Sequence, residues 1–256
     1  MKSDFSTLVF AGIIPARFAS TRFPGKPLVD IFGKPMVQHV YEKSQKVFDI
    51  VYVATDDERI FDTVVNFGGN AVMTSSEHKS GTDRCAEAVV AVQNKLNKKI
   101  DVVVNIQGDE PFIAESQLLA IKKMFDNDDT QIATLVKPFA DDEDIFDVNS
   151  PKVVVSKHDE ALYFSRSPIP FVRGSEKEKW KEQFVFFKHI GLYAYRTDIL
   201  MSISALPQGN LERAESLEQL RWLENGYKIN VMQTDVENYS IDTLEDLERL
   251  KNKVLL

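Results

Sequence analysis

Apolar residues in the first 140 positions follow two alternating patterns. Short, nearly continuous apolar runs are typical of strands buried in a parallel sheet, whereas apolar residues that recur every three or four positions are typical of helices. Strands that alternate with helices predict an α/β fold with a mostly parallel sheet. The predicted strands are Leu8–Ile14, Ile50–Ala54, Ala71–Thr74, Val102–Ile106 and Ile132–Val136, and the predicted helices are Pro35–Phe48, Asp57–Phe67, Thr82–Leu96 and Ser116–Phe125.

The pattern changes after about residue 140. Two short strand-like segments flank the polar residues 157–160, which predicts a hairpin. We therefore predict one domain over 1–256, built as a Rossmann-like core with a β-rich subdomain inserted around 140–196. The elements predicted for this part are strands at Lys152–Ser156, Ala161–Arg166, Phe184–Tyr195 and Lys228–Thr234 and helices at Glu215–Asn225 and Leu244–Val254.

Cysteine content and the N-terminal residues bear on the compartment. The 256-residue chain contains one cysteine, Cys85, so no disulfide can form within it, which is typical of a reducing compartment. The first residues carry the acid Asp4 instead of the basic start of a signal peptide. No run approaches the ~20 apolar residues of a membrane span. The sequence therefore predicts a soluble, cytoplasmic protein.

The net charge is −8. This balance repels polyanions at long range, so neither nucleic acid nor an anionic membrane is expected as a partner. A small anionic substrate is compatible with the sequence only where local basic residues and a metal ion reverse the field.

Three basic residues follow the first predicted strand. Arg17, Arg22 and Lys26 lie within ten residues of the expected carboxyl edge of the sheet, where open α/β sheets bind ligands. Guanidinium and ammonium groups suit phosphate oxygens. The alternative is a solvated basic loop. A Walker loop is excluded because its glycine–lysine spacing is absent, and no Gly-x-Gly-x-x-Gly follows the strand, which disfavours a dinucleotide-dependent oxidoreductase.

Two acids are candidate metal ligands. Asp109 follows the strand predicted at 102–106, and Asp242 precedes the last predicted helix. Mg²⁺ typically takes one or two carboxylates together with substrate phosphates. The alternatives are a simple turn at Asp109 and a helix cap at Asp242. Thr243 and Asp246 form a capping pattern of their own, which leaves Asp242 outside the helix.

These segments, in this order, resemble the 3-deoxy-manno-octulosonate (Kdo) cytidylyltransferases, also called CMP-Kdo synthetases. The resemblance covers nearly the whole chain and begins with Ile14-Pro-Ala-Arg17-x2-Ser20-x-Arg22-x-Pro24-x-Lys26-Pro27. Its further marks are Ile31–Met36, Val53–Asp56, His78–Arg84, Gln107–Pro111, Tyr163–Arg166, His189–Arg196, Leu217–Leu220 and Asp242-Thr243.

The resemblance implies a nucleotidyltransferase that joins CMP from CTP to Kdo with Mg²⁺, releasing pyrophosphate, for lipopolysaccharide biosynthesis. The residues that it implies for the nucleotide are Arg17, Ser20, Arg22, Lys26, Ser80, Gly81, Thr82, Arg84 and Gln107. Those that it implies for the sugar are Arg166, His189, Tyr193, Glu218 and Gln219. Asp109 and Asp242 would hold the metal, and these two acids with Arg17 and Lys26 would form the catalytic set.

The implied sugar residues make chemical sense, with one alternative. Arg166 can hold a carboxylate through two parallel hydrogen bonds, and Glu218 and Gln219 offer acceptors to sugar hydroxyls. His189 lies in an aromatic run, where a histidine satisfied within the core is the alternative.

Other functions remain as alternatives. A related enzyme could use sialic acid or 8-amino-Kdo as its sugar. A non-catalytic CTP-sensing module would lack a metal acid or a phosphate cation, yet all of these are present.

Two segments depart from the family pattern. The family usually has glycine before the last aspartate and proline after the threonine, whereas this chain has Tyr239-Ser240 and Leu244. An Asn-Pro-Asn type of turn is replaced by Asn149-Ser-Pro151. The shapes of both loops are therefore expected to differ from the family's.

The run 184–195 bears on the quaternary structure. Phe186-Phe187 and Leu192-Tyr193 place apolar groups on both faces of the predicted strand. Monomers rarely expose so large an apolar patch, so we predict a homodimer paired through this region, as the resemblance also suggests. The alternative is that helices of the same chain cover both faces.

Overall fold

The computed structural model describes residues 8–19, 23–241, 243 and 245–249, which divide into two compact units. Unit 1 comprises residues up to 119, 194–204 and those from 238 on, and unit 2 comprises 120–193 and 205–237. The β-rich segment predicted at 140–196 lies in unit 2 up to Tyr193. Its status as a subdomain within one domain stays a prediction.

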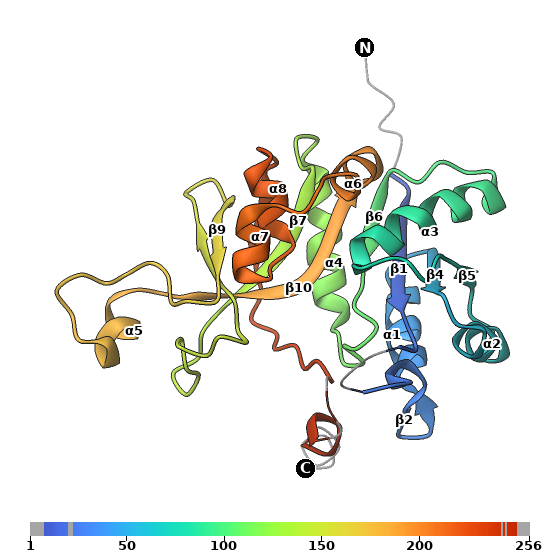
Figure 1. Ribbon diagram of the computed structural model, residues 1–256, viewed down its shortest axis with the longest axis horizontal. Helices are drawn as coiled ribbons and strands as arrows, with labels where there is room; N and C mark the ends of the chain where they lie inside the picture. The colour runs from blue at the N-terminus through green and yellow to red at the C-terminus, as the bar shows by residue number, and fades with distance from the viewer. Residues whose placement is uncertain (1–7, 20–22, 242, 244, 250–256) are drawn as a thin grey trace. The chain divides into compact units, whose positions relative to one another are not determined.

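Unit 1 contains four parallel strands in the order β6-β1-β4-β5 (Figure 1). All six residues of β4 are buried, as expected of a strand with parallel neighbours on both sides and cover on both faces. The sequence-based predictions of these strands are confirmed, with ends shifted by up to two residues. Their bounds are Phe10–Ala16 for β1, Ile50–Thr55 for β4, Ala71–Met73 for β5 and Val102–Asn105 for β6.

The helices of unit 1 cover this sheet. In α3 the apolar residues Cys85, Ala88, Val89 and Val92 recur at helical spacing and are fully buried, and the helix contacts β1, β4 and β6. The four predicted helices are confirmed. The helices have the bounds Met36–Gln45 (α1), Glu58–Asn66 (α2), Gly81–Leu96 (α3), Glu115–Lys123 (α4, which continues into unit 2) and Thr197–Ser204 (α6).

Short elements complete unit 1. A 3-10 turn η1 (Lys26–Leu28) leads into the hairpin of β2 (Asp30–Ile31) and β3 (Lys34–Pro35). The sequence analysis missed this hairpin and helix α6, because two-residue strands and an eight-residue helix carry little periodicity. The helix predicted at Leu244–Val254 is helical at 245–249, and the rest of that range lies outside the described residues.

Unit 2 combines a parallel strand pair with an antiparallel hairpin. Strands β7 and β11 are parallel, β8 pairs antiparallel with both β9 and β10, and β10 continues into unit 1. The predicted hairpin is confirmed, and Asp159 in its turn has a φ of 55°. A 3-10 turn η2 (Met124–Asp126) follows α4, and η3 (Lys177–Lys179) precedes α5. The other bounds are Ile132–Pro138 (β7), Lys152–Val155 (β8), Ala161–Ser165 (β9), Trp180–Gln183 (α5), Phe187–Arg196 (β10) and Ile229–Gln233 (β11).

Two predictions for unit 2 are wrong. The helix predicted at Glu215–Asn225 is two helices, α7 (Asn210–Glu215) and α8 (Gln219–Glu224). The break lies at Ser216, whose φ of 51° is left-handed, and no Gly or Asn in the sequence signals it. Strand β10 also begins at Phe187 instead of Phe184, because the Phe184 N–H donates to Trp180 O and ends helix α5.

Among the described residues, none of the helices combines the length and the apolar character that a membrane span requires.

Candidate active site

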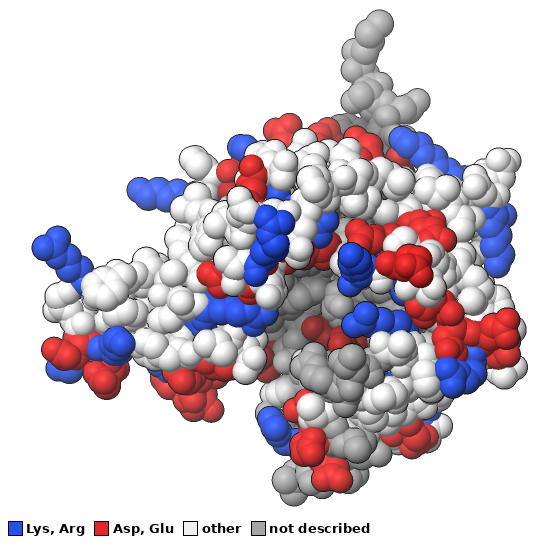
Figure 2. Space-filling view, in the orientation of Figure 1, with Lys and Arg blue, Asp and Glu red and all other residues white. Residues whose placement is uncertain are grey.

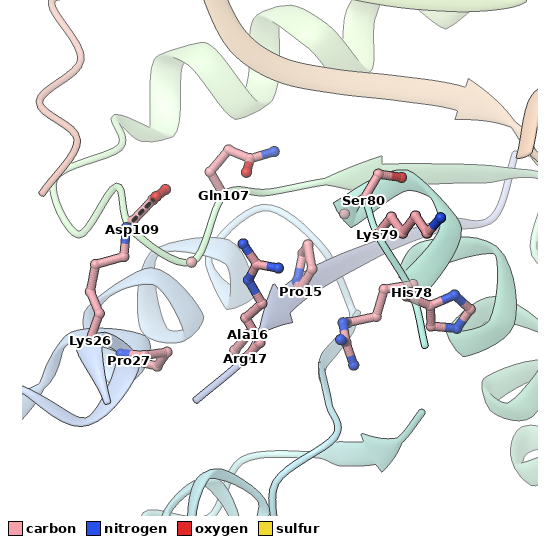
Figure 3. A pocket seen from close by; sticks show the side chains of 13 residues that line it. Pro15, Ala16, Arg17, Lys26, Pro27, His78, Lys79, Ser80, Gln107 and Asp109 are labelled. Carbon is pink, nitrogen blue, oxygen red and sulfur yellow. Dashed lines mark hydrogen bonds and ion pairs between the residues drawn. The ribbon is translucent and has the colours of Figure 1, made fainter. Parts of the chain in front are cut away.

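A polar pocket of about 240 Å³ lies in unit 1 at the C-terminal ends of β1 and β6. The segments that line it are 15–17 at the end of β1, 26–27 in η1, 78–81 before and at the start of α3, and 107–109 after β6, together with Arg84. Figure 3 shows Lys26 and Asp109 on one side, His78, Lys79 and Ser80 on the other, and Arg17 and Gln107 between them. Four segments distant in sequence thus meet at one sheet edge, where open α/β sheets bind ligands.

The pocket brings together most of the nucleotide residues that the resemblance implied. Thr82 is buried and is not among the lining residues. Ser20 and Arg22 lie outside the described residues. The predicted residues that do line the pocket are Arg17, Lys26, Ser80, Gly81, Arg84 and Gln107.

The N-terminus of α3 faces the pocket. Ser80 caps this helix, since its Oγ accepts a hydrogen bond of 3.1 Å from the N–H of Asp83. The first turn of a helix leaves backbone N–H groups without partners inside the helix and carries a partial positive charge, which favours anions. Ser80 and Gly81 therefore contribute the N-terminal end of the helix to the pocket, and Ser80 also contributes its hydroxyl group as the cap.

Arg84 is a buried cation at the wall of the pocket. Its guanidinium donates to Thr74 Oγ1 at 2.6 Å and to Asp56 Oδ2 at 2.9 Å, and the residue is only 3% exposed. These two bonds fix the guanidinium plane and compensate its charge. The sequence analysis quoted Asp56 as part of a motif but assigned no role to it or to Thr74, because a contact across parallel strands leaves no local signal.

Lys26 and Asp109 form an ion pair in the pocket, with Nζ and Oδ2 2.7 Å apart. The loop that carries Asp109 depends on Gly108, because a Cβ at this position would lie 2.9 Å from the backbone oxygen of Pro15. Glycine thus permits the close approach of the loop after β6 to the end of β1.

The carboxylate of Asp109 has the exposure and the available oxygen that a magnesium ligand needs. Its carboxylate is 28% exposed, and Oδ1 has no hydrogen-bond partner among the described residues. In that part of the chain no three His, Cys, Asp or Glu side chains form a metal cage. Mg²⁺ typically binds through one or two carboxylates and substrate phosphates. The second predicted ligand, Asp242, lies outside the described residues.

Glu110 follows Asp109 and is 7% exposed. Burial, with a contribution from the neighbouring Asp109 charge, raises the pKa of Glu110 to about 8, while a hydrogen bond from Asn238 acts in the opposite direction. The Asn238 Nδ2 group donates to Glu110 Oε2 at 2.6 Å. The sequence analysis gave no role to either residue.

The charge around the pocket differs from that of the whole chain. Figure 2 shows Asp and Glu side chains scattered over this face of the molecule with Lys and Arg among them. Among the described residues that line the pocket, the basic ones are Arg17, Lys26, Lys79 and Arg84, and the acidic one is Asp109. The local excess of cations suits an anionic ligand, although the net charge of the chain is negative.

In unit 2, three main-chain carbonyl groups hold the guanidinium of Arg166. Nε donates to Glu215 O at 2.7 Å, Nη1 to Val148 O at 2.9 Å and Nη2 to Ser216 O at 3.3 Å. A guanidinium has five N–H groups, so each Nη retains one that these bonds do not use. The break between α7 and α8 at Ser216 supplies one of the three acceptors.

His189 is neutral, because burial lowers its pKa to about 3. Its Nε2 lies 3.1 Å from Thr134 Oγ1, and that hydroxyl also lies within 3.1 Å of the carbonyl oxygens of Ile190 and Leu192. The hydroxyl has one hydrogen for these three partners, so Nε2 accepts from Thr134 in one tautomer of the ring and donates to it in the other.

The other sugar residues that the resemblance implied lie in the same unit. The Tyr193 ring centroid is 5.1 Å from that of His189 and 5.1 Å from that of Trp222. Burial, together with the negative charge of Glu218, raises the pKa of Tyr193 well above its ordinary value. Gln219 is 5% exposed, and its Nε2 has no hydrogen-bond partner among the described residues. A buried amide of this kind is typical of a group that a ligand completes.

The fold and the pocket are those of a nucleotidyltransferase. The family described as Cytidylyltransferase matches residues 11–229, so the chain belongs to the cytidylyltransferases. Proteins named 3-deoxy-manno-octulosonate cytidylyltransferase are 61% identical over 243 residues in Phocaeicola vulgatus (94% of this chain and 95% of the relative) and 60% identical over 251 residues in Bacteroides thetaiotaomicron (95% and 99%). The chain is therefore a member of the 3-deoxy-manno-octulosonate cytidylyltransferase family.

Solved structures agree with this membership. A CMP:2-keto-3-deoxy-manno-octonic acid synthetase complexed with CTP is similar at a TM-score of 0.86 and 41% identity, covering 96% of this chain and 98% of that one. A 4-diphosphocytidyl-2C-methyl-D-erythritol synthase from Anaerococcus prevotii shares the fold at 12% identity, with a TM-score of 0.60 and coverage of 97% and 99%. The predicted α/β, Rossmann-like class with a mostly parallel sheet is confirmed.

The depressed pKa of His189 predicts a pH effect on stability. Because its pKa is about 3 in the folded chain and about 6.5 when unfolded, unfolding takes up a proton below pH 6.5. This group therefore lowers the free energy of unfolding as pH falls from about 6.5 toward 3. His189→Gln should reduce the stability loss between pH 7.5 and 5 by about 2 kcal/mol in urea titrations. His158→Gln, at an exposed position, is the control and should keep the wild-type loss; an unchanged loss in His189→Gln would contradict the assignment.

Proposed function

We propose that this protein transfers the CMP group of CTP to the anomeric hydroxyl of Kdo, an eight-carbon 2-keto sugar acid, and releases pyrophosphate. The observation that carries the proposal is the pocket that gathers Arg17, Lys26, Asp109 and the N-terminus of α3 at one sheet edge. It occurs in a chain about 60% identical, over nearly its whole length, to relatives named for this reaction.

The nucleotide would bind in the pocket of unit 1. Arg17 and Lys26 would contact the triphosphate, and Lys26 would exchange part of its contact with Asp109 for phosphate oxygens. Arg84, held by Asp56 and Thr74, presents a fixed charge at the wall. Gln107 and the segment from Ser80 to Arg84 would orient the cytidine. Ser20 and Arg22 join the proposed nucleotide residues on the resemblance alone.

Asp109 and Asp242 would hold Mg²⁺. When bound, the metal neutralises charge on the triphosphate, as hard cations with oxygen ligands do.

The sugar acid would be recognised by unit 2. The two unused N–H groups of Arg166 suit its carboxylate. The Glu218 carboxylate can accept hydrogen bonds from hydroxyl groups, whereas Nε2 of the buried Gln219 can donate one. Nδ1 of His189 accepts or donates a hydrogen bond to the sugar according to the tautomer of the ring. Tyr193 would pack beside His189 with its hydroxyl protonated, because its pKa is raised.

The reaction forms one bond and breaks one. The anomeric oxygen bonds to the α-phosphorus, the bond from that phosphorus to the bridging oxygen breaks, and pyrophosphate leaves. The hydroxyl proton passes to solvent. The fixed cations Arg17, Lys26 and Arg84 would stabilise the negative charge dispersed over the phosphate oxygens, so positioning and electrostatics supply most of the catalysis.

Cellular location and pathway follow from the same proposal. The product, CMP-Kdo, would serve lipopolysaccharide biosynthesis. A cytoplasmic location agrees with CTP as the substrate and with the single, buried Cys85.

We also propose a homodimer formed through unit 2. The chain itself buries Phe186, Ile190, Leu192 and Tyr193, as the intrachain alternative expected. Other apolar residues of the unit remain exposed. These are Val148 (58%), Leu162 (59%), Phe171 (72%), Phe184 (40%) and Val185 (58%).

Two of the exposed residues belong to an aromatic cluster. The ring centroid of Phe171 lies 5.1 Å from that of Trp180, and the ring centroid of Phe184 lies 5.2 Å from that of Phe186. Both exposed residues lie at the solvent edge of this cluster. The segment between β9 and β10, which carries α5, extends away from the other elements of unit 2 (Figure 1). An exposed apolar surface of this kind is typical of a subunit interface, and twofold pairing is the most common arrangement.

Substrate specificity can be tested with a pyrophosphate-release assay. CTP, UTP and ATP are combined with Kdo, sialic acid and 8-amino-Kdo at fixed Mg²⁺. We expect turnover with CTP and Kdo to exceed every other pair at least tenfold, which is the effect of about 1.4 kcal/mol in transition-state binding. A preference for sialic acid or 8-amino-Kdo would reassign the sugar, and binding of CTP without turnover on any sugar would identify a CTP-sensing module.

The metal assignment predicts a specific loss. Asp109→Asn keeps the shape of the side chain and an acceptor for Lys26, but a neutral amide is a poor Mg²⁺ ligand. Turnover should fall by at least about 100-fold, equivalent to ~3 kcal/mol, with an unchanged unfolding temperature. Asp49→Asn, at an exposed position, is the matched control. Near wild-type turnover of Asp109→Asn at limiting Mg²⁺ would remove Asp109 from the metal site.

The dimer can be tested by light scattering. The wild type should have about twice the 29.1 kDa chain mass at micromolar concentration. Val185→Glu places a charge in the proposed interface and should give the monomer mass. Val65→Glu, on an exposed position of α2, should leave the dimer intact. A monomeric wild type would refute the dimer.

A further inference from the structure

We propose that Asn238 is a positioning residue that braces the segment leading to Asp242 against the loop that carries Asp109. This inference rests on the proposed metal site. Asn238 is half-buried, and both ends of its side-chain amide are engaged. Nδ2 donates to Glu110 Oε2 at 2.6 Å, and Oδ1 accepts from Gln117 Nε2.

The hydrogen bonds of this brace run in one direction. The backbone N–H of Ala114 can only donate, and it donates to Gln117 Oε1 at 3.1 Å. Gln117 must therefore present Nε2 to Asn238, which fixes Oδ1 of Asn238 toward Gln117 and Nδ2 toward Glu110. No other residue type of this size supplies an acceptor on one side and a donor on the other. The side chains of Gln117 and Glu110 are buried, so an unfilled partner at either end is costly.

The brace has a second attachment three residues later. The N–H of Ile241 donates to the backbone oxygen of Asp109 at 3.0 Å. Ile241 is fully buried and packs with Phe23, Ile31 and Met36. Asn238 and Ile241, at the two ends of one short segment, thus hold the consecutive residues Glu110 and Asp109. The residue that follows Ile241 in the chain is Asp242, the second proposed ligand.

This brace bears on the departure from the family pattern. Tyr239-Ser240 stands where the family usually has glycine, and both residues are exposed. The two residues between the attachments therefore contribute no buried side chain, and the attachments at Asn238 and Ile241 hold the two ends of the segment. Groups that orient metal ligands without touching the metal commonly affect metal affinity about 10- to 100-fold.

The test uses two variants of the full-length chain. Asn238→Asp keeps the size and the acceptor but removes the donor to Glu110, and Asn238→Ala removes both. Mn²⁺ binding is measured by electron paramagnetic resonance with CTP and without sugar, and pyrophosphate release is measured against Mg²⁺ concentration. Ser240→Ala, in the same segment at an exposed position, is the control.

We expect both Asn238 variants to bind Mn²⁺ about tenfold more weakly and to need about tenfold more Mg²⁺ for half-maximal turnover. The KM for CTP at saturating Mg²⁺ should stay within twofold of the wild type, and high Mg²⁺ should restore turnover. Mn²⁺ affinity within twofold of the wild type in both variants overturns the inference, whatever the turnover. A parallel rise in the KM for CTP that Mg²⁺ does not restore also overturns it, because that result indicates a general structural role.

Folding and the underlying proposal are controlled separately. Unfolding temperatures are recorded for every variant. If both Asn238 variants fail to fold, Gln117→Met is measured against the same thresholds, because it removes the donor that orients the Asn238 amide. If the wild type itself binds no Mn²⁺ and requires no divalent cation, the proposed metal site fails. If the wild type binds Mn²⁺ and the variants bind it equally well, only the role of Asn238 fails.

Discussion

Parallel pairing of β1 with β6 decides where chemistry can occur in unit 1. Ile13 lies opposite Asn105, and the N–H of Ile106 donates to Ile13 O at 2.9 Å. The pairing with β6 ends at this point, so residues 15–17 at the end of β1 and residues 107–109 after β6 lie side by side at the edge of the sheet. The absence of a Cβ at Gly108 allows these segments to approach closely. Arg17, Lys26 and Asp109 meet because of this register.

Local organisation of charge allows an acidic protein to form an anion site. The cations of the pocket are arranged in two ways. Arg84 is buried and held by Asp56 and Thr74, whereas Lys26 is paired with Asp109 and can share its charge with a ligand. The N-terminus of α3 adds a partial positive charge. A field built from fixed groups needs little rearrangement when a polyphosphate binds.

Unit 2 organises its polar side chains through the backbone. Three carbonyl groups hold the guanidinium of Arg166. Ser216, in the left-handed region between α7 and α8, turns a carbonyl toward Arg166 and ends α7 two residues before Glu218. A helix running through Ser216 would have kept that carbonyl within its own hydrogen bonds. The break in the helix is thus part of the proposed sugar site.

The sequence by itself determined the alternating α/β order, the parallel strands, the hairpin and the family. These follow from apolar periodicity and from ordered local motifs, which depend on neighbouring residues. Only the tertiary structure decided which of the named residues meet. In the structure Arg84 contacts Asp56, and Asn238 contacts Glu110. Thr82 does not line the pocket, and the predicted helix is interrupted at Ser216. These contacts connect residues up to 128 positions apart, and a single sequence holds no local signal for them because they depend on strand register and on loop conformation.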